Sequence, residues 1–111
     1  MNFKTETTDN RTIVFVREER LDAHNSNDLR TEMNRIFDSG SKNLIIDLRE
    51  VRFIDSSGLG ALVSGFKNAS TRQGSLKLSG LQTQVKSMFE LTRLHRIFDI
   101  YPNTDEALNS Y

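Results

Sequence analysis

The sequence contains no cysteine and no tryptophan, a single proline, and no excess of either charge. The lack of cysteine excludes disulfide bonds, thiolate catalysis and cysteine-ligated zinc, and it is compatible with a reducing cytoplasm, where we expect the protein. Fifteen basic residues balance fifteen acidic ones, so we expect no direct binding to nucleic acid or to a membrane surface. Neither a signal-peptide stretch after Met1 nor a run of roughly 18 apolar residues is present.

The length of 111 residues fits one domain, 1–111, with one modest hydrophobic core. Hydrophobic residues make up 36% of the chain and charged residues 27%, which is slightly polar but well above the apolar content of disordered chains. A small surface of mixed charge is compatible with a monomer, which is the state we expect.

Strand-like runs alternate with amphipathic segments along the chain. The predicted strands cover 3–7, 12–17, 43–48, 76–78 and 96–101, and the predicted helices cover 29–37, 59–69, 85–89 and a last segment from 104. Strands that alternate with helices pair in parallel through right-handed crossovers, and a turn at Asp9-Asn10 predicts an antiparallel N-terminal hairpin. The order ββαβαβαβα therefore predicts an α/β fold: a mixed, mostly parallel sheet with 43–48 at its centre, covered by about four helices.

Polar residues and glycines mark the ends of the predicted helices. Asn25, Ser26 and Asn27 are candidate N-caps of the first helix, and Gly40 is a natural stop for it. Thr104 is the candidate cap of the last helix.

The most informative stretch is 53–60, Phe-Ile-Asp-Ser-Ser-Gly-Leu-Gly, which reads as a turn followed by a helix start. Ser56 or Ser57 can accept hydrogen bonds from the first free helical amides. Gly58 and Gly60 let another chain approach the backbone closely and weaken the first turn by roughly 1 kcal/mol each relative to alanine. The residues alone leave two interpretations open: an ordinary serine cap, or a serine hydroxyl that receives phosphate at a helix N-terminus.

Several segments in order resemble a STAS domain, specifically a bacterial anti-sigma factor antagonist. The resemblance covers nearly the whole chain and rests on Leu21-Asp22, Ile-Ile-Asp-Leu at 45–48, Asp-Ser-Ser-Gly-Leu-Gly at 55–60 and Asp-Glu-Ala-Leu at 105–108. The resemblance implies a phosphorylated serine directly after the aspartate, which is Ser56. It also implies a phosphate-site and partner neighbourhood made up of Asp22, Asp55, Ser57, Gly58, Leu59 and Gly60.

The same resemblance implies how the protein works. An anti-sigma factor that is also a serine kinase of the GHKL type binds the unphosphorylated protein, which frees a sigma factor, and it releases the phosphorylated protein. A PP2C-like phosphatase reverses the modification. No catalytic residue, cofactor or metal is implied for this chain. The family commonly has a glycine shortly before Leu-Asp, whereas this chain reads Glu18-Glu19-Arg20, which changes the charge near the partner surface.

Two other interpretations compete. A STAS-domain scaffold or switch in a kinase and phosphatase network without a sigma factor is the main alternative, and a serine hydrolase is a remote one. A hydrolase needs a histidine base, and the spacing of His24 and His95 identifies neither as that base or as a metal ligand. Asp22 either belongs to the phosphate site or is an ordinary helix cap. Asp47 is expected to accept hydrogen bonds from loop amides.

Overall fold

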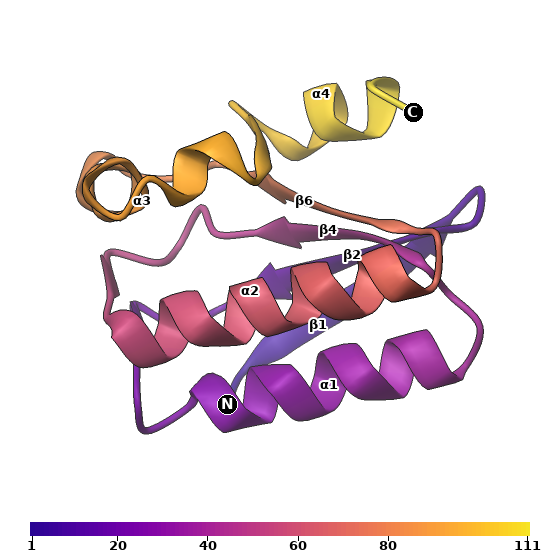
Figure 1. Ribbon diagram of the computed structural model, residues 1–111, viewed down its shortest axis with the longest axis horizontal. Helices are drawn as coiled ribbons and strands as arrows, with labels where there is room; N and C mark the ends of the chain where they lie inside the picture. Colours follow the sequence, from indigo (N-terminus) through magenta and orange to yellow (C-terminus); the bar gives the residue numbers. More distant parts are fainter.

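The computed structural model describes all of residues 1–111. Its main sheet has five strands, and in Figure 1 this sheet lies above α1 and α2. The strands lie in the order β1 (Phe3–Thr8), β2 (Arg11–Val16), β4 (Asn43–Asp47), β6 (Ser75–Ser79) and β7 (Asp99–Tyr101). β1 pairs with β2 antiparallel, and all other neighbours in this sheet pair in parallel. Asp9 and Asn10 both have positive φ, as the two-residue hairpin turn between β1 and β2 requires.

The main core lies between one face of this sheet and two helices, α1 (Ser26–Asp38) and α2 (Ser56–Thr71), which run side by side in Figure 1. Alternation along the strands points Val14, Ile46 and Leu78 toward these helices, where they meet Phe37 and Leu62. All five of these side chains are essentially inaccessible to water. Burial of alternate strand residues against two apolar helix faces therefore sets the register of the sheet.

The remaining helices complete the structure. α3 (Thr83–Leu91) contributes Val85 and Phe89 to the main core. It is followed by a 3-10 turn, η1 (Leu94–Arg96). The opposite face of the sheet carries α4 (Thr104–Asn109), where Ala107 packs on Ile13 and Ile45. None of the helices combines the length and the apolar character that crossing a membrane requires.

The predicted α/β fold is confirmed, including the antiparallel hairpin and the central position of 43–48. A second sheet was not predicted. Two very short strands, β3 (Arg20–Leu21) and β5 (Phe53–Ile54), pair in parallel. The predicted strand at 96–101 begins only at Asp99, because left-handed Arg93 starts η1 and the amides of Arg96 and Ile97 bond within that turn.

The helix-end predictions are partly wrong. Gly40, with φ of 104°, follows the end of α1 as expected. Asn25 occupies the N-cap position of α1, but its side chain bonds the amide of Asp22 and the carbonyl of Arg20 instead of the helix. The cap of α4 is Asn103, not Thr104, because the Thr104 hydroxyl donates to Asp47 at 2.7 Å. Asp47 also accepts from the amide of Arg49 at 2.9 Å, in keeping with its expected structural role.

Candidate functional site

Ser56 is the first residue of α2, and the residue that caps this helix is Asp55. The Oδ1 atom of Asp55 accepts from the amide of Gly58 at 3.0 Å. The predicted serine cap is therefore wrong, since the carboxylate one position earlier already satisfies this amide and suits the positive end of the helix. Neither serine hydroxyl makes a hydrogen bond, and Ser56 is exposed whereas Ser57 is half-buried.

Asp55 also ties the start of α2 to the segment that precedes α1. Its Oδ2 atom accepts from the amide of Ala23 at 3.2 Å, and its own amide donates to the carbonyl of Leu21 at 3.2 Å. The β3–β5 pairing brings the two segments to this position, with Leu21 beside Ile54. Two segments that are more than thirty residues apart in sequence, one with Asp22 and the other with Asp55, therefore meet beside Ser56.

Asp22 is a buried carboxylate at this junction. One of its oxygens accepts from the amide of His24 at 3.0 Å, and the other accepts from Nε of Arg20 at 3.1 Å. The hydrogen bond from the His24 amide, helped by Arg20 and opposed by desolvation, holds the pKa of Asp22 below its usual range. Asp22 is therefore fixed as an anion, and it orders the turn into α1.

The residues that follow Ser57 shape this turn. An added Cβ on Gly58 would collide with the carbonyl oxygen of Leu21 and approach Cγ1 of Ile54 to 2.7 Å. Leu59 is only 5% exposed and belongs to the main core. Gly60 lies beneath the guanidinium of Arg30, which would be 3.2 Å from an added Cβ. Gly58 thus allows the close approach of α2 to Leu21, Leu59 anchors the start of α2 in the main core, and Gly60 has Arg30 beside it.

Sequence reasoning placed Arg20 near the partner surface but missed the role of Phe53 beside it. The guanidinium of Arg20 lies 4.2 Å from the ring centre of Phe53, a residue that is 43% exposed. A large exposed aromatic side chain stacked on a cation is a feature of protein-binding surfaces. The only sequence signal for Phe53 was its apolar character. β5 has two residues, which is too short for a pattern of alternation to show that Phe53 faces solvent.

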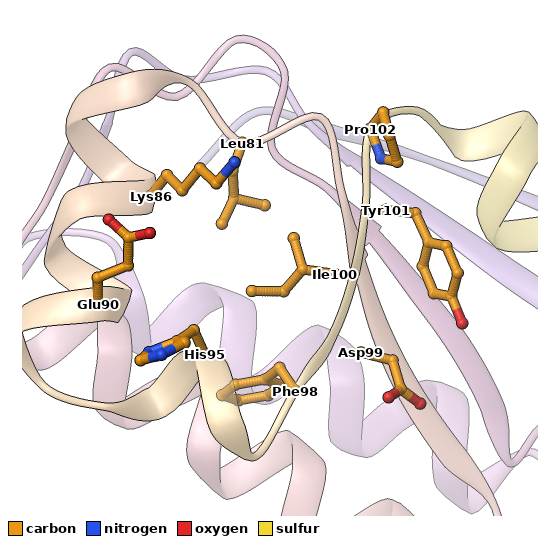
Figure 2. Close-up of a pocket in the computed structure, with 9 residues that line it drawn as sticks. All are labelled: Leu81, Lys86, Glu90, His95, Phe98, Asp99, Ile100, Tyr101 and Pro102. Carbon is orange, nitrogen blue, oxygen red and sulfur yellow. The ribbon is translucent and has the colours of Figure 1, made fainter.

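The largest hollow on the molecule lies elsewhere, among α3, η1 and β7 (Figure 2). It encloses about 690 Å³, and in Figure 2 the side chains of Leu81, Phe98 and Ile100 lie between Glu90 and His95 on one side and Pro102 on the other. None of the predicted site residues lines it. The Nδ1 atom of His95 lies 3.3 Å from the carbonyl oxygen of Phe89, and neither histidine side chain bonds Ser56.

A model of the STAS domain family matches residues 2–107. This chain belongs to the STAS domain family. The resemblance drawn from the sequence is therefore confirmed, and the serine block lies at the start of α2 in a STAS domain.

Curated relatives of this STAS domain are named anti-sigma factor antagonists. The anti-sigma F factor antagonist of Paenibacillus polymyxa is 27% identical over 110 residues, which cover 97% of this chain and 94% of the relative. The anti-sigma-B factor antagonist of Bacillus subtilis is 35% identical over 80 residues, which cover 72% of each chain. Neither name describes an enzyme.

Solved structures show the same fold. The anti-sigma factor antagonist SpoIIAA in its unphosphorylated form superposes with a TM-score of 0.84 at 20% identity, covering 98% of this STAS domain and 95% of that chain. SpoIIAA in its phosphorylated form superposes with a TM-score of 0.77 at 19% identity, covering 98% of both chains. At these identities the similarity concerns the fold.

Proposed function

We propose that this STAS domain is an anti-sigma factor antagonist, a partner-switching protein that regulates transcription. The unphosphorylated form binds an anti-sigma factor that is also a GHKL-type serine kinase, and this binding frees the sigma factor. The observation that carries the proposal is the exposed, unpartnered hydroxyl of Ser56 in a STAS domain whose relatives are named anti-sigma factor antagonists. The proposal covers the chain from 1 to 111 as a monomeric cytoplasmic domain.

Ser56 is the phosphate acceptor in this proposal. The kinase supplies ATP and Mg²⁺. The bond between the β,γ-bridging oxygen and the γ-phosphorus of ATP breaks, and the γ-phosphorus forms a new bond to Oγ of Ser56. ADP leaves, and the hydroxyl proton passes to a base of the kinase. The two oxygens of Asp55 accept from the amides of Gly58 and Ala23, and neither makes a hydrogen bond with the Ser56 hydroxyl. This chain contributes the hydroxyl and the rigid turn that presents it.

The partner surface surrounds Ser56. It combines Ser57, the Arg20–Phe53 stack and the turn held by Asp22 and Asp55, with Gly58, Leu59 and Gly60 shaping it from behind. Phosphorylation would add about −1.5 to −2 charges to this surface. Because Ser56 lies outside the core, the added charge changes the surface far more than the fold.

A modest repulsion is enough to release the partner. A loss of about 1.4 kcal/mol weakens binding tenfold. An uncompensated charge pressed into a protein interface costs several kcal/mol. The phosphorylated form therefore leaves the anti-sigma factor, which is then available to the sigma factor again. A PP2C-like phosphatase restores the hydroxyl by hydrolysis.

The test is phosphate mapping with the kinase that copurifies with the Ser56→Ala protein. Incubation of the wild-type protein with this kinase and ATP should place phosphate on Ser56, as read by mass spectrometry of the peptides. Ser70→Ala, an exposed serine near the other end of α2, is the matched control and should be modified like the wild type. Phosphate found only on another residue would overturn the assignment.

A second arm tests the output. Adding the unphosphorylated protein to a complex of the kinase and a sigma factor should free the sigma factor. If the kinase modifies Ser56 but holds no sigma factor, the switch belongs to another signalling network, and the transcriptional part of the proposal fails.

A further inference from the structure

Arg30, in the second turn of α1, has a guanidinium without a partner. Only two arginines of the chain are half-buried, Arg11 and Arg30. The guanidinium of Arg11 stacks on the ring of Tyr111 at 4.6 Å, whereas Arg30 makes no hydrogen bond, ion pair or ring contact. The guanidinium of Arg30 therefore keeps five N–H donors that are not used within the chain.

The missing side chain at position 60 determines where this guanidinium lies. The Nη2 atom of Arg30 is 3.2 Å from the place that a Cβ of residue 60 would occupy. Arg30 therefore crosses the surface of α2 over the bare backbone of Gly60. A larger residue at position 60 would displace it.

Ser56 is one helical turn from this point on the same face of α2. Residues four apart in a helix lie one above the other, with Cβ atoms roughly 5–6 Å apart. Nη2 of Arg30 consequently lies no more than about 9 Å from Cβ of Ser56. α1 and α2 run side by side (Figure 1), and Cβ bonds in a helix tilt toward its N-terminus. A phosphate on Ser56 would extend into the gap between Cβ of Ser56 and the guanidinium of Arg30, within reach of the flexible Arg30 side chain.

We infer that Arg30 binds the phosphate of phosphorylated Ser56 within the same molecule. This inference rests on the proposed function only in taking Ser56 as the modified residue. The planar fork of arginine matches two phosphate oxygens. A counter-charge is needed because the carboxylates of Asp22 and Asp55 are already present at this end of α2. Arg30 thereby joins the phosphate to α1 and gives the modified protein an ion pair that the unmodified protein lacks.

Phosphoserine incorporated at position 56 during translation allows a direct test without a kinase. The measurement is a pH titration of the phosphate by ³¹P NMR, together with the unfolding midpoint. The variants are Arg30→Gln and Arg30→Met, the second keeping an apolar stem. Lys42→Gln is the matched control, since it removes one positive charge beside Gly74, near the other end of α2. The charged groups on the neighbouring segments are the same in all four proteins: Arg20, Asp22, His24, Asp28 and Asp55.

The expected result is a phosphate pKa about half a unit lower in the wild type and in Lys42→Gln than in either Arg30 variant. Phosphorylation should also raise the unfolding midpoint more in the wild type than in the Arg30 variants, and 0.5 M salt should shrink the difference. Equal phosphate pKa values in wild type and both Arg30 variants would overturn the inference. This outcome is independent of whether a kinase modifies Ser56, so the two proposals can fail separately.

Discussion

The two glycines of the serine block should respond in opposite directions to an added methyl group. In Gly58→Ala, the new Cβ would collide with the carbonyl oxygen of Leu21 and lie 2.7 Å from Cγ1 of Ile54. Carbon atoms prefer separations of about 3.5–4.0 Å. The carbonyl has little freedom to move, because it accepts from the amide of Asp55 and belongs to β3.

The expected magnitudes follow from these surroundings. Forcing a methyl group into a filled space costs about 1–3 kcal/mol, and the better helix propensity of alanine offsets less than about 1 kcal/mol of this. In Gly60→Ala the only close neighbour is the flexible end of Arg30 at 3.2 Å. This variant should therefore keep most of the propensity gain of up to about 1 kcal/mol.

Thermal unfolding of the two variants provides the assay. Near 4 °C per kcal/mol for a domain of this size, Gly58→Ala should unfold several degrees below the wild type and Gly60→Ala at or slightly above it. Chemical denaturation gives the same ranking without heating. Equal stability of the two alanine variants would refute the argument that the Leu21 carbonyl, and not helix propensity, requires glycine at position 58.

Three further outcomes are expected. Asp55→Ala should lose about 0.5–2 kcal/mol of folding free energy, because it removes the cap of α2, whereas Ser57→Ala should lose much less in the same urea titration. Burial raises the pKa of Tyr111 in the folded protein. The free energy of unfolding that this shift contributes is therefore fully present below the pKa of tyrosine in the unfolded chain, and it is lost as the pH rises through the higher pKa of the folded protein. Tyr111→Phe should abolish that part of the alkaline loss in denaturation curves measured against pH, and an unchanged loss would contradict this cause. Ser56→Asp should bind the anti-sigma factor more weakly than Ser56→Ala by calorimetry, and equal binding would show that charge at position 56 is not what releases the partner.

Much of the architecture could be predicted because the periodicity of apolar residues reports directly on burial. The run 43–48 is apolar on both faces, and β4 lies at the centre of the sheet. The Asp9-Asn10 turn likewise predicts the hairpin, since these residue types tolerate the positive φ that both adopt. These features depend on neighbours in sequence, and sequence reasoning handles such features well.

The details of the site depend on contacts between distant segments. Three polar residues in a row can cap α2, and the choice of Asp55 is fixed by its bonds to Leu21 and Ala23, which no local pattern contains. The β3–β5 pair is only two residues long on each strand and has no measurable period. Arg30 becomes relevant to Ser56 only through the packing of α1 against α2.

Phosphate on Ser56 should weaken the binding of this chain to the anti-sigma factor kinase. The most direct measurement is the Kd of that kinase for two preparations of this chain, one with serine and one with phosphoserine at position 56, at equal salt and nucleotide concentrations. Binding at least about tenfold weaker is expected for the phosphoserine form, which corresponds to about 1.4 kcal/mol. Equal Kd values for the two preparations would contradict this expectation.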